Sequence, residues 1–377
     1  MRFRYLLIFT TVCTLSAGLI ISCKKKDDAV SPDNSFDRVA LLTNLGNNII
    51  IPNYQSLVNA VNKLDSAITA FNANPNASNL TNLQNIFKDS YRAWQYCSVF
   101  EIGPADTEFL RANSNTFPTD TTRINTNVSS GTYSLAAAAN LAAKGFPGLD
   151  YLLFGTGADN AHILAKYTTD ANATNRKKYL KDLSAELKTN TTFVLNSWLL
   201  STDGNYIKTF ISASGTDVGS SLGLLINQLN LDLDILKNNK LGIPLGKQSN
   251  GAQLINKTEA FYSGISAELA LIELQTMQNI YLGKSTVQGD GVGLDDYLIQ
   301  LNSQYNGGTL NDAIKNQFAT AITKLQAVPD PLSNTILNNT TVVNSAYTEA
   351  QKLLVLLKTD MPSALGVQIT YADNDGD

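Results

Sequence analysis

The feature that most constrains this chain of 377 residues is a recurrence of apolar side chains at helical spacing. In the clearest stretch they recur at steps of four and three, as Leu57, Val61, Leu64, Ile68 and Phe71. Such steps place side chains on one face of an α-helix, which then packs against other helices. Further stretches with this pattern begin at Leu80, Leu180, Leu222, Phe261, Leu310 and Val343. The stretch from Phe261 is expected to end near Leu282, and the last helix to end before Pro362.

Segments with the alternating pattern of β-strands are nearly absent, so the sequence predicts an all-α protein. About 350 residues follow the N-terminal segment, which is more than one hydrophobic core usually serves. We therefore expect two up-and-down helical bundles packed side by side, over residues 37–203 and 204–377. The first bundle is expected to contain an irregular insert at about 101–160, which is rich in glycine and proline. A Gly- and Ser-rich stretch at 201–221 is interpreted as the inter-domain connection.

The N-terminus has the layout of a bacterial export signal. Arg2 and Arg4 precede an almost unbroken apolar run from Leu6 to Ile21, which ends at Ser22 and Cys23. This run is shorter than the roughly 20 residues that a membrane-spanning helix needs. Residues 1–22 are therefore expected to be a cleaved signal peptide, and an uncleaved membrane anchor is the alternative.

The pair Ser22-Cys23 resembles the lipobox of bacterial lipoproteins, in which the cysteine sulfur carries lipid. Several acyl chains, at about 0.8 kcal/mol per buried methylene, give an effectively permanent membrane anchor. Residues 23–36 are charged and aperiodic, and they are predicted to be a tether between lipid and fold. The basic-then-acidic stretch after Cys23 also resembles the surface-export signal of Bacteroidetes lipoproteins. The expected location is the outer membrane of the cell envelope, on its periplasmic or surface side.

The charge of the chain bears on its partners, and its cysteine content bears on disulfide bonds. The mature chain would keep 26 of the 28 Lys and Arg residues against 32 acidic residues, a formal net charge of about −6. Because no basic stripe occurs, nucleic acid is not expected as a partner. Cys97 would be the one free cysteine of the mature chain, so no internal disulfide is expected, and a buried, inert thiol is predicted there.

The most distinctive segment is the run from Gly145 to Gly155, GFPGLDYLLFG. Its glycines allow a tight backbone entry, and Pro147 suits the first turn of a helix because that turn needs no backbone N–H bond. Asp150 is expected in the same first turn, where the helix dipole favours a carboxylate. The apolar residues that follow are expected to be buried in a bundle.

This segment is similar to the signature of the imelysin family, Gly-x-His-x-x-Glu followed by an aromatic residue and two leucines. Other stretches resemble the family in the right order along the chain, namely Arg92–Gln95, Glu101–Pro104, Leu241–Gly246 and Glu259–Gly264. The C-terminal run from Leu353 to Asp377 is similar to Bacteroidetes members. The resemblance covers roughly residues 36–377.

The resemblance implies two helical bundles, an envelope location, a link to iron or haem uptake, and a functional site between the bundles. The family was first described as a peptidase family. Carried over to this chain, the binding residues are Trp94, Glu101, Pro147, Asp150, Glu259, Tyr262 and Ser263. Two positions depart from the signature, since Pro147 stands in place of His and Asp150 in place of Glu. Proline has no lone pair for a metal ion, so Asp150 is the one metal ligand left of the pair.

Signatures of other enzyme or metal sites are absent from the sequence. His162 is the only histidine, and it is expected to be an ordinary surface or helix-end residue. A zinc peptidase needs several nitrogen or sulfur ligands, and neither His-Glu-x-x-His nor Gly-x-Ser-x-Gly occurs. The acidic stretches Gln288–Asp296 and Asp373–Asp377 are interpreted as solvated loop and tail, because the second lacks the EF-hand spacing.

We therefore expect a non-catalytic binding lipoprotein of the imelysin type. Its expected ligand is iron or haem, and its expected partners are the membrane, through Cys23, and an outer-membrane receptor or transporter. A metallopeptidase of the imelysin type is the first alternative. A helical substrate-binding lipoprotein for an outer-membrane transporter is the second.

Replacing Cys23 by Ala is expected to abolish lipidation, because the cysteine sulfur is the acceptor of the diacylglycerol. The measurement is incorporation of radiolabelled palmitate in growing cells, together with fractionation of membranes. A Cys97→Ala variant is the matched control and should be labelled like the unaltered protein. Labelling that persists in Cys23→Ala would overturn the assignment of the anchor.

Overall fold

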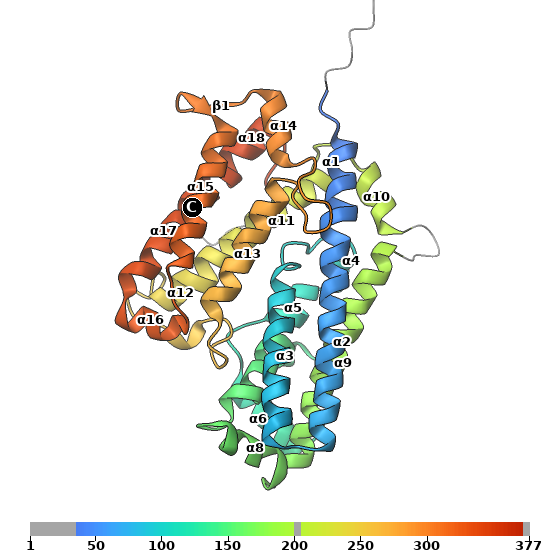
Figure 1. The fold of residues 1–377 in the computed structure, drawn as a ribbon, viewed down its shortest axis with the longest axis vertical. Helices are drawn as coiled ribbons and strands as arrows, with labels where there is room; N and C mark the ends of the chain where they lie inside the picture. The colour runs from blue at the N-terminus through green and yellow to red at the C-terminus, as the bar shows by residue number, and fades with distance from the viewer. Residues whose placement is uncertain (1–34, 200–204, 372–377) are drawn as a thin grey trace, which may run out of the picture. The chain divides into compact units, whose positions relative to one another are not determined.

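The structure, a computed structural model, describes residues 35–199 and 205–371. Within it the first long helices pack as the apolar stretches predict. Helix α2 (Ile51–Ala73) turns back at Asn74–Asn76 into α3 (Ala77–Gln95) and also packs along α9 (Ala173–Leu199). These three helices lie side by side in Figure 1. The predicted stripe residues at their contacts are buried, among them Leu64, Phe87 and Trp198.

The chain between α3 and α9, predicted as an irregular insert, consists of short helices joined by loops. In order they are α4 (Pro104–Thr107), α5 (Leu110–Asn115), α6 (Thr121–Ser130), the 3₁₀ helix η2 (Ala138–Ala143), α7 (Gly145–Asp150), the π-helical turn η3 (Tyr151–Gly155) and α8 (Asn160–Thr168). Helix α7 packs on α5 and on α9, which brings the distinctive segment onto the long helices. Short α1 (Arg38–Asn44) and η1 (Leu45–Ile50) precede α2.

A second set of helices follows. Helix α15 (Leu310–Gln326) packs against α13 (Ser266–Tyr281) and α17 (Thr340–Val355), and α17 also packs on α11 (Ser221–Ile235). The other elements of this part are α10 (Tyr206–Ser212), η4 (Leu236–Gly242), α12 (Ile243–Leu245), η5 (Ile255–Lys257), α14 (Leu294–Leu301), the antiparallel two-residue strands β1 (Gln304–Tyr305) and β2 (Gly308–Thr309), α16 (Leu332–Asn338), η6 (Leu356–Asp360) and α18 (Met361–Leu365).

The described residues from Asp37 onward form one compact unit, in which helix α13 of the second set packs directly on α3 of the first. Arg92 on α3 spans this contact with a two-pronged ion pair to Glu268 on α13, with N–O distances of 2.8 and 2.9 Å. Helix α10 packs on α1 and α9. The boundary at residues 203 and 204 and the division into two bundles stay predictions. The signal peptide, Cys23 and the tail Asp373–Asp377 lie outside the described residues.

Three prolines follow π-helical turns without ending their helices. In the turns η1, η4 and η6, the backbone N–H of the residue before proline bonds the carbonyl five residues back, as Ile51 does to Gly46, Ile243 to Asn238 and Met361 to Leu356. A proline inside an α-helix lacks a donor and clashes with the carbonyl four residues back. The wider turn relieves both problems, so the backbone stays helical through Pro52, Pro244 and Pro362.

Two predicted helix boundaries are wrong, for different reasons. The last helix was expected to end before Pro362, but the π-helical turn η6 carries it on to Leu365. The fifth helix was expected to start at Phe261, but α13 begins at Ser266. Left-handed backbone at Ala260 (φ 49°) and Gly264 (φ 68°) breaks the helix there and keeps residues 259–264 as a loop.

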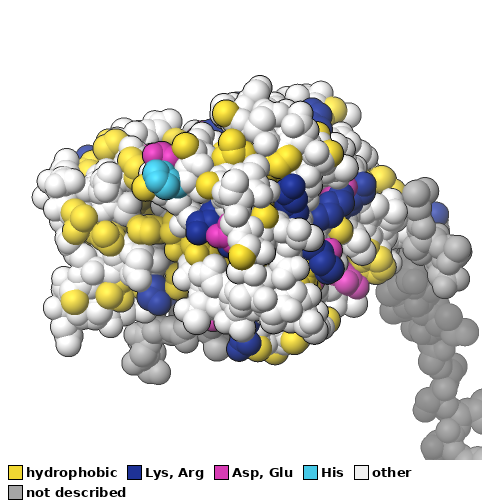
Figure 2. All heavy atoms as spheres, turned by 90° about the horizontal axis from the view of Figure 1, so that it is seen from below, with side chains coloured by type: hydrophobic (Ala, Val, Ile, Leu, Met, Phe, Trp, Pro, Cys, Tyr) yellow, Lys and Arg dark blue, Asp and Glu magenta, His cyan; other side chains and the backbone are white. Residues whose placement is uncertain are grey.

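The all-α prediction is confirmed, since β1 and β2 are the only paired strands in the described residues. No described helix is long and apolar enough to cross a membrane. The Cys97 thiol is buried, as predicted, and burial raises its pKa. On the face drawn in Figure 2, basic and acidic side chains are scattered among hydrophobic patches and uncoloured surface.

Candidate functional site

The segment Gly145–Gly155 enters the fold through a position that only glycine fits. Gly145 has a φ of +64°, and a Cβ atom there would lie 2.2 Å from the backbone oxygen of Ser114. Pro147 is the third residue of α7, so its missing N–H falls among the donors that a first turn leaves unpaired. Its carbonyl accepts a 2.9 Å hydrogen bond from the Thr119 hydroxyl. Both residues are buried.

Asp150 is not in the first turn of the helix, as the sequence had suggested, but is the last residue of α7. The prediction failed because α7 begins at Gly145, which puts Asp150 in the second turn of a helical segment that continues through η3 to Gly155, beyond the first turn that the dipole favours. Its carboxylate instead reaches the loop before α13. One oxygen accepts from the backbone N–H of Tyr262 and the other from that of Ser263, each at 2.9 Å.

Burial raises the pKa of Asp150 to about 6, although the hydrogen bonds from Ser263 and Tyr262 oppose the shift. The aromatic ring of Tyr262 packs on that of Tyr151, with centroids 5.2 Å apart. The structure therefore brings together three predicted site residues, Asp150, Tyr262 and Ser263, as a junction between α7 and the loop. Asp150 acts there as a cap for two backbone donors.

The residues at this junction do not fit a resident metal ion. Pro147 offers no side-chain ligand, and both oxygens of Asp150 are engaged by backbone donors. Within residues 35–199 and 205–371, no group of three or more His, Cys, Asp or Glu side chains is arranged to hold a metal. That Asp150 ligates a metal stays a prediction.

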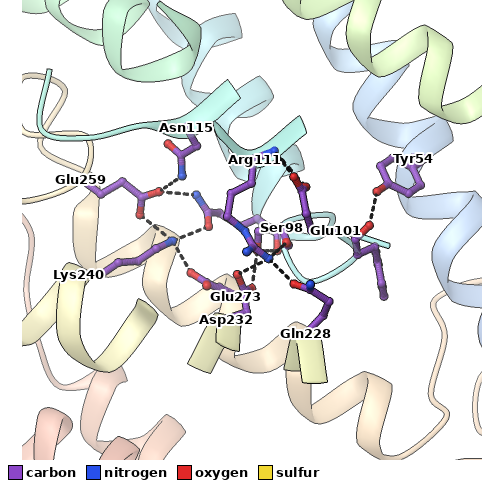
Figure 3. Close-up of polar contacts among 12 residues, drawn as sticks. Tyr54, Ser98, Glu101, Arg111, Asn115, Gln228, Asp232, Lys240, Glu259 and Glu273 are labelled. Carbon is purple, nitrogen blue, oxygen red and sulfur yellow. Dashed lines mark hydrogen bonds and ion pairs between the residues drawn. The ribbon is translucent and has the colours of Figure 1, made fainter. Parts of the chain in front are cut away.

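The remaining predicted site residues lie apart from this junction. Trp94 is fully buried and packs against Phe146, with ring centroids 6.2 Å apart, so its role is in the core. Glu259 and Glu101 belong to a buried network of charged groups that Figure 3 shows. This network joins the end of α3 and helix α5 to α11, η4 and α13.

Lys240 is the cation at one end of the network and is only 3% exposed. Its ammonium pairs with Glu259 at 2.9 Å, pairs with Glu273, and donates to the Gln95 side-chain oxygen at 2.9 Å. Glu259 also accepts bonds from the side chains of Gln95 (3.0 Å) and Asn115 (2.7 Å). Burial alone would lower the pKa of Lys240, but Glu259 and Glu273 outweigh it and raise that pKa.

Arg111 is the cation at the other end (Figure 3). Its guanidinium lies 3.3 Å from a carboxylate oxygen of Asp232, and it donates to the Ser98 backbone oxygen at 2.9 Å. Asp232 also accepts from the Ser98 hydroxyl at 2.9 Å. The backbone N–H of Arg111 lies 3.0 Å from both carboxylate oxygens of Glu101. Burial nevertheless raises the pKa of Glu101 to about 7, against the influence of Arg111.

Three carboxylates lie close together in this network, and two of them, Glu259 and Glu273, contact Lys240. Burial raises the pKa of Glu273 well above its usual value, Lys240 opposes the rise, and Asp232 and Glu259 add to it.

Sequence reasoning found Glu259 and Glu101 through the family resemblance but missed Lys240, Glu273, Asp232 and Arg111. A signal was present, because Asp232, Lys237 and Lys240 interrupt an otherwise leucine-rich helix. Charged residues are almost never fully buried unless they are paired. The sequence could not show which partners would meet them, since Lys240 and Gln95 are 145 residues apart.

His162 lies where the sequence predicted, at a helix end. It is in the first turn of α8, its side chain is 68% exposed, and a ring nitrogen lies 2.8 Å from the Asp159 carboxylate. The histidine side chain, coloured cyan, is visible on the surface in Figure 2. It is far along the chain from the buried network and contributes nothing to it in this structure.

A sequence model of one family, described as Imelysin (Peptidase_M75), matches residues 50–360 of the chain. The iron-regulated protein A of Synechococcus elongatus is 24% identical over 299 residues, which cover 76% of this chain and 75% of the relative.

Two solved structures share the fold. One is called an iron-regulated protein A precursor, from Parabacteroides distasonis, with a TM-score of 0.73 and 17% identity. The other is an imelysin-like protein from Psychrobacter arcticum, with a TM-score of 0.67 and 18% identity. Each comparison covers 89% of this chain and 97% of the other chain. The predicted family resemblance is confirmed.

Replacing Lys240 by Met is expected to lower the free energy of unfolding by about 3–5 kcal/mol, because it leaves buried carboxylates without their cation. The measurement is urea denaturation of the mature chain. Lys324→Met, at an exposed position on α15, is the matched control and should change stability by about 0.5 kcal/mol or less. A loss below about 1 kcal/mol in Lys240→Met would show that the network contributes little.

Glu101 makes stability fall as pH rises. Its pKa is about 7 in the folded chain and about 4.3 when unfolded. Between these values the folded state holds more protons, so the free energy of unfolding decreases with pH, by at most ~3–4 kcal/mol from this group. Glu101→Gln should remove this component, and its stability relative to the unaltered chain should rise between pH 4 and 8. A difference independent of pH, measured by urea denaturation, would contradict the assignment.

Proposed function

The chain belongs to the imelysin family, and on that premise we propose that it is a non-catalytic binding component of the cell envelope that serves iron or haem acquisition. The iron connection is supported by the names of similar proteins, since one relative and one structural neighbour are called iron-regulated protein A. The envelope location is supported by the export signal and the lipobox at Cys23.

The residues at the family motif, and the hydrogen bonds that they make, support the non-catalytic part of the proposal. A metal-assisted peptidase needs a metal held by protein ligands, with an open position for water or substrate. At this motif Pro147 supplies no ligand, and Asp150 uses both oxygens on the N–H groups of Tyr262 and Ser263. A carboxylate held in this way fixes the loop to α7, so the motif serves to hold the structure together. The iron or haem is then cargo that the protein binds or hands on to a receptor.

The charged network supports the same reading. Its carboxylates surround Lys240, whose ammonium already supplies the positive charge that a metal ion would otherwise bring. Lys240 and Glu259 are almost fully buried, so this cluster is closed to a large substrate. Its physical effect is to join α3 and α5 to η4 and α13.

The role in iron acquisition is tested by deleting the gene and growing cells with and without an iron chelator. We expect normal growth in iron-rich medium, slower growth under chelation, and restoration by the unaltered gene. Restoration should fail with the Cys23→Ala variant, because that protein is not anchored. Equal growth of the deletion strain and its parent under chelation would overturn the role in iron acquisition.

The non-catalytic role is tested by incubating the mature chain with casein in the presence of Zn²⁺ or Fe²⁺. We expect no cleavage, and Asp150→Ala should behave like the unaltered chain. Cleavage that needs the metal and disappears in Asp150→Ala would establish the metallopeptidase instead. A Pro147→His variant restores the residue of the signature, and iron binding by this variant alone would show that the unaltered motif has lost that capacity.

A further inference from the structure

We propose that Asn306 is a site of spontaneous deamidation, at which the backbone nitrogen of Gly307 attacks the Asn306 side chain. These two residues form the turn of the hairpin between β1 and β2, which Figure 1 shows at the upper left. The pair Asn-Gly occurs once more in the sequence, as Asn250 and Gly251. From the structure we expect the two pairs to react at different rates. The inference does not depend on the role in iron acquisition.

The reaction is intramolecular and needs only water as a co-reactant. The backbone nitrogen of Gly307 gives up its proton to hydroxide and forms a bond to the side-chain carbonyl carbon of Asn306. The carbon–nitrogen bond of the side-chain amide breaks, and its nitrogen leaves as ammonia. Water then opens the five-membered imide ring at one of its two carbonyl groups, which gives aspartate or isoaspartate. Glycine favours ring closure because it has no Cβ atom to obstruct the attack.

The two Asn-Gly pairs share nearly the same backbone conformation and exposure. The φ angles are 50° and 85° at Asn250 and Gly251, and 47° and 84° at Asn306 and Gly307. Positive φ at both residues is typical of a type I′ turn. All four residues are exposed, and a Cβ atom added at either glycine would meet no atom within 4 Å. Neither the turn conformation nor access to water therefore separates the two pairs.

The hydrogen bonding of the attacking nitrogen differs between the two pairs. The backbone N–H of Gly251 donates to the carbonyl oxygen of Gly246 at 2.9 Å. In the part of the chain that the structure describes, no group accepts a hydrogen bond from the N–H of Gly307. A nitrogen whose proton is held by an acceptor must break that bond before it can lose the proton and turn toward the side chain. A backbone bond of ordinary strength therefore slows the attack by roughly three- to tenfold.

Further bonds hold the turn at Asn250 in place. The backbone N–H of Ser249 donates to the Gly246 oxygen at 3.2 Å, and its hydroxyl donates to the Ala252 oxygen at 2.6 Å. The turn at Asn306 joins strands of only two residues each. Because a short hairpin is marginally stable in water, this turn opens more readily. Opening lets the side-chain carbonyl and the next backbone nitrogen approach each other.

The conversion would change the hairpin and leave the helix after it intact. Aspartate and isoaspartate each add one negative charge, and isoaspartate also lengthens the backbone by one carbon atom. The longer turn would disturb the pairing of Tyr305 with Gly308. Helix α15 keeps its own cap, because the Thr309 hydroxyl oxygen accepts from the backbone N–H of Asp312 at 3.1 Å. The change is therefore confined to the hairpin.

The experiment is incubation of the folded mature chain in mildly alkaline buffer, followed by proteolytic digestion and mass spectrometry. The gain in mass of each asparagine peptide gives the extent of reaction, and fragmentation assigns the residue and distinguishes isoaspartate from aspartate. We expect Asn306 to react about three- to tenfold faster than Asn250, with isoaspartate among the products. The same chain unfolded in guanidinium chloride is the matched control. Without folded structure the two pairs should react at similar rates.

An Asn306→Gln variant should lose the reaction in the hairpin peptide and keep the unaltered rate at Asn250, and circular dichroism verifies that it folds. Equal rates at the two pairs in the folded chain, or a faster reaction at Asn250, would overturn the proposal. Absence of reaction at Asn306 in the folded chain, while the unfolded chain reacts, would overturn it as well. A product with aspartate but no isoaspartate would contradict attack by the Gly307 nitrogen.

Discussion

The cluster that Lys240, Glu259 and Glu273 form with Gln95 and Asn115 is the buried polar contact that ties the two sets of helices together. A buried charge without a partner costs several kcal/mol, so each of these groups requires the others to be in place. The partners come from η4, α13 and the loop between them, and Gln95 at the end of α3 completes the cluster. The ion pair of Arg92 with Glu268 strengthens the same contact at the surface.

The family motif shows how a site can keep its place while its chemistry changes. Gly145 preserves the close approach of the backbone to Ser114, which no larger residue permits. The histidine of the signature is replaced by Pro147, and the carboxylate of Asp150 is used to cap two backbone donors. The proposal of a binding role without cleavage rests on these two departures from the signature.

Prediction from sequence succeeded in locating individual long helices. Apolar residues at steps of three and four identified α2, α3 and α15, because burial of one helix face is a local property of the sequence. It failed where the backbone departs from the ordinary α-helix. Pro362 was expected to end its helix, yet a π-helical turn before it carries the helix onward. The start of α13 was placed too early, because apolar residues in the preceding loop continue the helical spacing without helical backbone.

The sequence by itself determined the helical class and the family, and it predicts the export signal with its cysteine and the loss of the signature histidine at Pro147. These properties are encoded in contiguous residues and need no knowledge of contacts. Only the tertiary structure decided what Asp150 does, because its hydrogen-bond partners are 112 and 113 residues away. It likewise decided that Lys240 is a buried cation and that Arg111 pairs with the buried Asp232. The reason is physical: the charge state and the role of a side chain are set by the groups that surround it, and folding alone brings those groups together.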